Sequence, residues 1–153
     1  YLIKNLLQHP EQHNALMADA TLVQGAISET LRNESSGKTG LARYASEDIE
    51  IQGHLIKKGQ MVQLITSTAG MDPLIYNDPS TFDIQRDHDK SISFGQGPHY
   101  CIGVTLVRSQ TEVMLKELFK RFPNLSLGDE VVYDYGHHNA RRMDVMMVNT
   151  NLS

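Results

Sequence analysis

Residues 94–103 read Phe-Gly-Gln-Gly-Pro-His-Tyr-Cys-Ile-Gly, and they contain the only cysteine of the chain, Cys101. An apolar pattern of helical period follows directly behind them, so we expect Cys101 at the start of a helix. A helix N-terminus presents backbone N–H groups and a positive dipole, which stabilise a thiolate. Glycines on both sides of the cysteine let a flat, bulky partner approach the backbone. The stretch therefore predicts a cysteine thiolate bound to a metal cofactor.

Two other interpretations of this loop are available. Free cysteine is among the most buried residue types, so Cys101 taken alone would suit a core position. Glycines near a helix start also suggest a phosphate cradle, but a dinucleotide fingerprint needs Gly-x-Gly-x-x-Gly after a strand. Gly103 comes six residues after Gly97, so that spacing fails. The complete loop favours the metal cofactor.

The loop resembles the haem-ligand loop of the cytochrome P450 family, Phe-Gly-x-Gly-x-(His/Arg)-x-Cys-x-Gly, and every fixed position is filled. The resemblance implies that Cys101 is the proximal and catalytic iron ligand of haem b, because an axial thiolate pushes electron density toward the iron. His99 would bind a haem propionate. Phe94 would pack near the sulfur, and two backbone N–H groups would donate to it. The cofactor-binding residues that the loop supplies would be Cys101, His99, Phe94, Gly95, Gly97, Ile102 and Gly103.

Glu29 and Arg32 form a second motif, on a segment over residues 24–32 that reads as a helix. Their i,i+3 spacing places them on one face, where a guanidinium can pair bidentately with a carboxylate. On solvated helices such pairs contribute only about 0–1 kcal/mol. The pair resembles the Glu-x-x-Arg motif of the P450 family, and residues 82–86 resemble the family segment that adds a second arginine. The resemblance implies a buried structural triad of Glu29, Arg32 and Arg86.

Residues 49–56 alternate polar and apolar side chains, which predicts a short β-hairpin with turns at Gly53 and Gly59. The stretch resembles the small sheet that follows the Glu-x-x-Arg helix in the P450 family. The resemblance implies that Arg43, at the start of this region, binds the other haem propionate. An exposed arginine at the start of a strand is the alternative.

The remaining segments predict a helix-rich molecule. Residues 11–32 carry helix signals with a break near Asp19-Ala20, and we favour a helix over a strand at residues 62–69. Behind Cys101, apolar residues recur with a helical period until Pro123 stops the helix. Strand-like runs at residues 130–133 and 144–148 predict a terminal hairpin. The expected fold is mainly α with small antiparallel β-hairpins (α+β), as in the C-terminal part of the cytochrome P450 fold.

Several positions outside these motifs also bear on function. Gly70 and Met71 stand where the family usually has Asn and Arg, which removes polar contacts. Arg108 and Lys116 are expected on a solvated helix face, with contact to an acidic electron donor as the alternative. The histidines at 137–138 point apart in a strand and lack a third ligand of suitable spacing, so we expect no metal site there.

Composition limits the class of protein. The chain has 153 residues, of which 40% are hydrophobic and 21% charged, with a net charge of −4. This suits one domain-sized core, and the absence of a basic stripe gives no reason to expect nucleic acid. One cysteine excludes an intrachain disulfide. No secretory segment or long apolar run is present, so we expect a cytoplasmic protein that does not insert into a membrane.

The resemblance implies that residues 1–153 are the C-terminal haem-binding portion of a soluble, bacterial-type P450 monooxygenase, without its N-terminal part and oxygen-side helix. Such an enzyme inserts one oxygen atom from O₂ into a small organic substrate, with electrons from a ferredoxin or flavodoxin-type donor. We expect the chain alone to do this inefficiently, and to associate with itself or with a missing N-terminal chain. The alternatives are a non-catalytic haem-binding or interaction module, and a structural domain in which Cys101 is buried and haem is absent.

Overall fold

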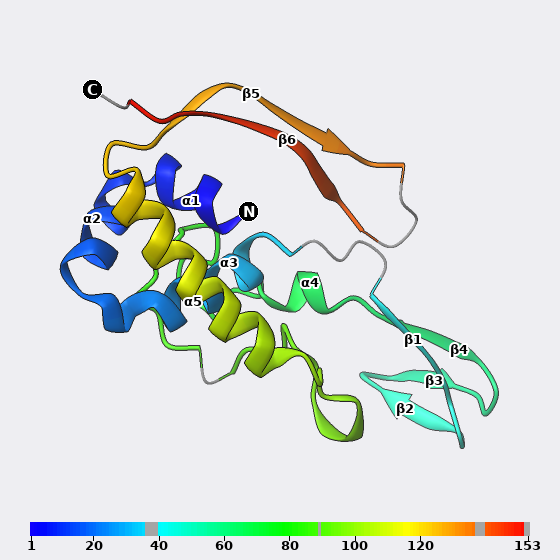
Figure 1. Ribbon diagram of the computed structural model, residues 1–153. Helices are drawn as coiled ribbons and strands as arrows, with labels where there is room; N and C mark the ends of the chain where they lie inside the picture. The colour runs from blue at the N-terminus through cyan, green and yellow to red at the C-terminus, as the bar shows by residue number, and fades with distance from the viewer. Residues whose placement is uncertain (36–39, 89, 137–139, 152–153) are drawn as a thin grey trace.

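Four helices pack together at one end of the molecule, and a two-stranded ribbon projects from the other (Figure 1). The computed structural model describes residues 1–35, 40–88, 90–136 and 140–151. The four helices are α1 (Leu2–Gln8), α2 (Pro10–Ala18), α3 (Val23–Asn33) and α5 (Val104–Arg121). Three shorter elements are the 3-10 turns η1 (Ala20–Leu22) and η2 (Gly97–His99) and the helical turn α4 (Thr66–Ala69).

The strands of the described residues form three antiparallel pairs. These are β1 (Leu41–Tyr44) with β4 (Met61–Leu64), β2 (Ile49–Ile51) with β3 (His54–Ile56), and β5 (Ser126–Asp134) with β6 (Arg142–Asn149). The β5–β6 hairpin lies over the helices near α1, and the other two pairs form the projecting ribbon (Figure 1). The predicted class, mainly helical with small antiparallel hairpins, is confirmed.

Local sequence explains three of the helix boundaries. Pro10 occupies the first position of α2, where its missing N–H costs no hydrogen bond. The predicted break at Asp19-Ala20 is confirmed, because the Asp19 carboxylate accepts from the Thr21 amide at 2.9 Å and caps η1. Pro123 disfavours helical backbone at the residue before it, and α5 ends at Arg121.

Two predictions differ from the structure in extent, namely the helix at residues 62–69 and the two terminal strands. The helix favoured at residues 62–69 is wrong for its first half, because β4 continues to Leu64 and only α4 is helical. The reason is non-local: β4 pairs with β1 in the register Leu41 to Leu64, and those ladder bonds override local preference. The hairpin turns expected at Gly53 and Gly59 are confirmed, and the predicted terminal strands are longer than expected at both ends.

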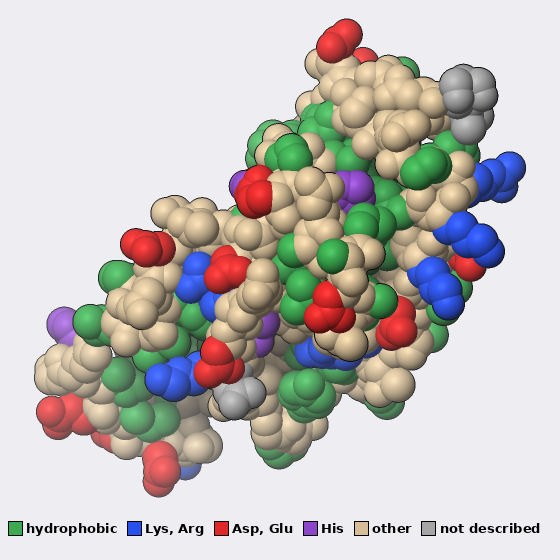
Figure 2. Space-filling model, turned by 90° about the vertical axis from the view of Figure 1, so that its left-hand side faces the viewer, with side chains coloured by type: hydrophobic (Ala, Val, Ile, Leu, Met, Phe, Trp, Pro, Cys, Tyr) green, Lys and Arg blue, Asp and Glu red, His purple; other side chains and the backbone are tan. Residues whose placement is uncertain are grey.

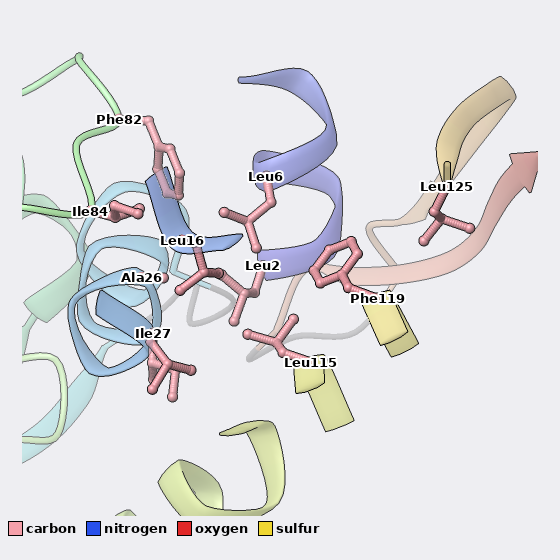
Figure 3. Close-up of a cluster of buried hydrophobic side chains, with 11 residues drawn as sticks. Leu2, Leu6, Leu16, Ala26, Ile27, Phe82, Ile84, Leu115, Phe119 and Leu125 are labelled. Carbon is pink, nitrogen blue, oxygen red and sulfur yellow. The ribbon is translucent and has the colours of Figure 1, made fainter. Parts of the chain in front are cut away.

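The core lies where the four helices meet the segment that follows α4 (Figure 3). Leu6 and Ala26 are completely buried, and Phe82 and Ile84 extend from that segment into the same cluster. The Gln12 side chain accepts from the Ile84 amide at 3.0 Å, which satisfies a backbone group that the core would otherwise strand. The full cluster is Leu2, Leu6, Leu16, Val23, Ala26, Ile27, Phe82, Ile84, Leu115, Phe119 and Leu125.

Helix α5 contributes less to this core than its sequence period suggests. Only Leu115 and Phe119 are buried, whereas Leu106 and Val113 remain 60% and 62% exposed. On the face of the molecule shown in Figure 2, hydrophobic side chains reach the surface among charged and polar ones. Among the described residues, no helix is both long and apolar enough to cross a lipid bilayer.

Gly25 tests how closely α3 packs against the segment that carries Ile84. A β-carbon at position 25 would lie 2.1 Å from the Ile84 carbonyl oxygen, so Gly25→Ala forces the two backbones apart. Helix propensity alone would make this substitution stabilising by about 1 kcal/mol. We expect instead a loss of about 1–3 kcal/mol or more in urea unfolding, with Ser109→Ala on exposed α5 as the near-neutral control. A stabilised Gly25→Ala variant would contradict the packing described here.

Candidate functional site

The loop over residues 94–103 is held in shape by its own backbone. The Cys101 amide donates to the Phe94 carbonyl oxygen at 3.0 Å, and the Tyr100 amide donates to that of Gly97 at 3.0 Å. Gly95 and Gly97 have φ angles of +74° and +68°, a region that side chains disfavour. The glycine spacing noted in the sequence therefore has a conformational cause, because the loop requires both residues.

Cys101 is exposed and precedes the helix rather than beginning it. Helix α5 begins at Val104, with Gly103 as its N-cap, so the expected helix start at Cys101 is wrong by three residues. The Val104 amide donates to the Cys101 carbonyl oxygen at 3.4 Å. A β-carbon on Gly103 would lie 3.7 Å from the sulfur, so Gly103 flanks the thiol directly, while the Ile102 side chain points fully into solvent.

A cavity of about 520 Å³ opens between this loop and strand β1. Arg43 from β1 and Gly95 and His99 from the loop all line it, although they are far apart in the sequence. Arg43 is the third residue of β1, not its start, and it is half-buried. The other lining residues are mostly apolar: Leu41, Leu64, Ile65, Thr66, Ile92, Gln96 and Pro98. The cavity thus combines apolar walls with two side chains able to bind carboxylates.

The other loop residues lie away from this cavity. Cys101, Gly97, Ile102 and Gly103 are not among its lining residues, and Phe94 lines a second cavity of about 420 Å³ against α3 and α5. The structure therefore brings Arg43, Gly95 and His99 together on one side of the loop. Phe94 lies on the other side.

Glu29, Arg32 and Arg86 meet in the interior of the molecule. The Arg32 guanidinium grips the Glu29 carboxylate with two hydrogen bonds of 2.7 Å, and both side chains are almost completely buried. Arg86 adds a third contact, from Nε to Glu29 Oε1 at 3.3 Å. The Asp83 amide donates to the same oxygen at 2.9 Å.

Burial by itself raises the pKa of Glu29, but the hydrogen bonds from Arg32 and from the Asp83 amide, together with the charge of Arg86, outweigh it. The net effect holds the pKa of Glu29 below its ordinary value of 4.5, so the carboxylate stays ionised. One carboxylate between two guanidinium groups leaves this buried site with a net positive charge.

The remaining N–H groups of Arg32 and Arg86 donate to backbone carbonyl oxygens of the segment between α4 and the loop. Arg32 donates to Gly70 and Pro79 at 2.7 Å each and to Thr81 at 3.1 Å. Arg86 donates to the carbonyl oxygens of Asn77, Asp78 and Thr81. These contacts could not be predicted from the sequence. Every residue has a backbone carbonyl, so the pattern of side chains does not show which carbonyls accept a hydrogen bond.

The departures at Gly70 and Met71 have a structural explanation. A β-carbon at Gly70 would lie 2.6 Å from the Arg32 carbonyl oxygen and 3.1 Å from the Arg32 side chain. Met71 places its sulfur 3.7 Å from Arg32 Nη1. Both residues therefore pack closely against Arg32.

His88 adds a titratable group to the triad. Its Nε2 lies 3.8 Å from Glu29 Oε2, and neither ring nitrogen has a hydrogen-bond partner. Burial is the largest influence and lowers the pKa of His88. Glu29 and Asp87 raise the pKa, but burial together with the charges of Arg32 and Arg86 prevails, so the net shift is downward. His88 belongs to no motif, so its place beside the triad could not be predicted from the sequence.

A second ion cluster, not anticipated from the sequence, ties the terminal hairpin to α1 and α3. Glu34 accepts from Lys4 and from Arg141 at 2.6 Å each. Lys4 also donates to the Tyr133 hydroxyl at 3.1 Å, and the Tyr1 hydroxyl donates to the Arg141 carbonyl oxygen at 2.6 Å. Burial opposes the charge on Lys4, but the bonds to Glu34 and Tyr133 prevail and raise its pKa.

Arg108 and Lys116 differ from each other in placement. Lys116 is exposed, as expected of a solvated face. Arg108 is half-buried and turns inward, so its expected place on a solvated face is wrong: it donates to Gln24 and Ser28 on α3 and lies over the Phe94 ring. No group of three metal-ligating side chains occurs within the described residues, and positions 137–138 lie outside them.

A family model for cytochrome P450 matches residues 3–132. The match spans most of the chain, and the chain therefore belongs to the cytochrome P450 family. Its relatives include several bacterial oxygenases. Epothilone C/D epoxidase of Sorangium cellulosum is 37% identical over 142 residues, which cover 93% of this chain and 33% of the relative. Vitamin D3 dihydroxylase of Streptomyces griseolus is 43% identical over 122 residues, covering 80% and 30%.

Solved structures agree with this assignment. Epothilone D-bound cytochrome P450epoK superposes with a TM-score of 0.93 at 36% identity, covering 99% of this chain and 38% of that one. P450BioI, crystallised with an acyl carrier protein, gives a TM-score of 0.88 at 38% identity, covering 96% and 38%. The chain thus spans about a third of the length of the curated relatives it matches.

Replacing the central carboxylate of the triad should be costly. Glu29→Gln leaves two buried guanidinium groups without their counter-charge, so we expect a loss of about 3–5 kcal/mol in the free energy of unfolding at neutral pH. The carboxylate stabilises the fold only while ionised, so the difference from the parent chain should shrink as the pH falls below 4.5 and through its lowered pKa. Urea unfolding across pH measures both effects. Asp144→Asn, which breaks an exposed pair with Arg142, is the control and should change little.

His88 should make the fold sensitive to mild acid. Because burial lowers its pKa in the folded chain, the unfolded chain binds more protons just below the ordinary value of 6.5, and stability falls as the pH drops through that window. His88→Gln should therefore reduce the drop in Tm between about pH 7 and about pH 5. His54→Gln, at an exposed position of β3, is the control. An unchanged pH slope in His88→Gln would show that His88 does not contribute.

Proposed function

We propose that residues 1–153 are the C-terminal, haem-binding portion of a bacterial-type cytochrome P450 monooxygenase, with Cys101 as the proximal iron ligand. The observation that carries the proposal is the cavity beside the loop of residues 94–103, which Arg43 from β1 and His99 from the loop both line. Family membership supports it, and the chemistry of the residues fits the cofactor: an exposed thiol, apolar walls and two groups suited to propionates.

Each residue would act on haem in its own way. When bound, haem supplies the iron at which O₂ is activated for insertion of one oxygen atom into an organic substrate. Cys101 would supply its thiolate to the iron, and the Ile102 and Gly103 amides would donate hydrogen bonds to the sulfur and moderate its charge. Arg43 and His99 hold the two propionates. Gly95 and Gly97 give the loop the backbone shape that keeps side chains away from the macrocycle.

Glu29, Arg32 and Arg86 would serve the site by support rather than by chemistry. They bind the carbonyls of the segment that leads into the Cys101 loop, and they lie outside the cavity that Arg43 and His99 share. Fixing that segment fixes where the loop begins. We therefore assign the three residues a structural role.

The partners of the parent enzyme follow as part of the same proposal. We propose electron delivery by a ferredoxin or flavodoxin-type donor, a small organic molecule as substrate, and a cytoplasmic location. Names such as epothilone C/D epoxidase and 6-deoxyerythronolide B hydroxylase support an organic substrate. Exposed apolar side chains on the projecting ribbon, such as Leu55 and Met61, favour association with an N-terminal chain or with a second copy.

The ferrous–carbon monoxide spectrum of the haem-reconstituted chain tests the central claim. We expect a band at about 450 nm, which requires an axial thiolate and which Cys101→Ser should lack. Arg43→Gln should weaken haem binding by roughly tenfold or more through loss of a charged hydrogen bond, whereas Arg142→Gln on exposed β6 should not. A chain that takes up no haem, or a Cys101→Ser variant with an unchanged band, would refute the proposal.

A further inference from the structure

Arg108 connects helix α3, which carries Glu29 and Arg32 of the triad, to the loop that carries the cysteine. Its Nη1 donates to Gln24 Oε1 at 2.8 Å, and its Nη2 to Ser28 Oγ at 3.3 Å, both on α3. Its guanidinium carbon lies 5.7 Å from the centre of the Phe94 ring. One side chain of α5 therefore contacts both α3 and the first residue of the Cys101 loop.

The contact with Phe94 reaches Cys101 through the backbone. The carbonyl oxygen of Phe94 accepts the Cys101 amide hydrogen bond at 3.0 Å. Any restraint on Phe94 consequently restrains the acceptor that sets the position of Cys101. Arg108, Phe94 and Tyr100 line the same cavity of about 420 Å³, so this side of the loop has space into which Phe94 could swing if Arg108 did not hold it.

The partners of Arg108 are neutral throughout the described residues: an amide, a hydroxyl and an aromatic face. Gln24 is itself fixed by Glu112, one turn further along α5, through a bond of 3.1 Å from its Nε2. Because these partners of Arg108 are neutral, its positive charge acts on the electron-rich face of the Phe94 ring. Because Gln24 is oriented at both ends of its amide, the guanidinium is held in one geometry.

We propose that Arg108 is a positioning residue for Cys101, acting through Phe94, rather than a surface contact for an electron donor. The inference rests on the proposed function only for its consequence, namely that a fixed Cys101 keeps its thiolate on haem iron. The restraint itself belongs to the protein. It is present before any cofactor binds and can be measured without one.

Amide hydrogen exchange in the haem-free chain measures the restraint directly. Arg108→Gln keeps hydrogen-bonding capacity but loses the charge, and we expect exchange at the Cys101 amide to rise roughly three- to tenfold. Arg108→Lys retains a cation over the ring and should restore most of the protection. Arg121→Gln is the matched control, because Arg121 lies 5.6 Å from the Phe122 ring on the same helix but remote from the loop. It should leave Cys101 exchange unchanged.

Two further comparisons separate local positioning from loss of fold. Phe94→Leu removes the aromatic face and should mimic Arg108→Gln, and the double variant should be no faster than either single one. After haem loading, Arg108→Gln should shift intensity in the ferrous–carbon monoxide spectrum from the band at about 450 nm toward about 420 nm, as the thiolate is lost. Unchanged Cys101 exchange, or equal acceleration throughout α3 and α5, would overturn the inference. A parent chain without haem would refute the proposed function and leave the exchange result standing.

Discussion

The buried pair of Glu29 and Arg32 is the constraint on which the rest of the molecule depends. Removing a carboxylate and a guanidinium from water is expensive, and a pair of this kind persists only when every donor and acceptor is satisfied. Here the requirement is met by an amide at Asp83, by Arg86 and by carbonyls of a distant segment. The segment between α4 and the Cys101 loop has little regular structure, so these bonds, together with Phe82 and Ile84 in the core, determine its path.

The Cys101 loop is consequently supported on one side and open on the other. On the α3 side, the Arg108 guanidinium lies over the Phe94 ring, and Arg32 of the triad binds the segment that leads into the loop. On the β1 side, Arg43 and His99 border a cavity with apolar walls. A ligand loop benefits from this asymmetry, because a thiolate must be rigidly placed while a large planar group still has room to enter. The architecture separates those two demands onto opposite faces of a single short loop.

The sequence predicted features that depend on neighbouring residues, and failed where distant ones decide. Glycine spacing around Cys101 and the i,i+3 relation of Glu29 and Arg32 are local, and both have clear conformational counterparts. The residues of β4 favour a helix when read alone, because the pairing of β4 with β1 is not visible in them. The period of α5 indicated a helix correctly, but it could not indicate that Leu106 and Val113 lack neighbours to cover them. The cluster around Glu34 joins residues from both ends of the chain and carries no motif.

The way Arg32 binds its surroundings has a consequence for evolution. Its partners at Gly70, Pro79 and Thr81 are backbone carbonyls, which every amino acid supplies. The arginine therefore recognises the course of the chain and not its side chains. Side chains along this segment that do not touch Arg32 can change as long as the course is preserved, whereas Gly70 cannot, because a β-carbon there would lie 2.6 Å from the Arg32 carbonyl oxygen. A lineage can thus vary the surface of this segment extensively while the charged centre beneath it stays unchanged.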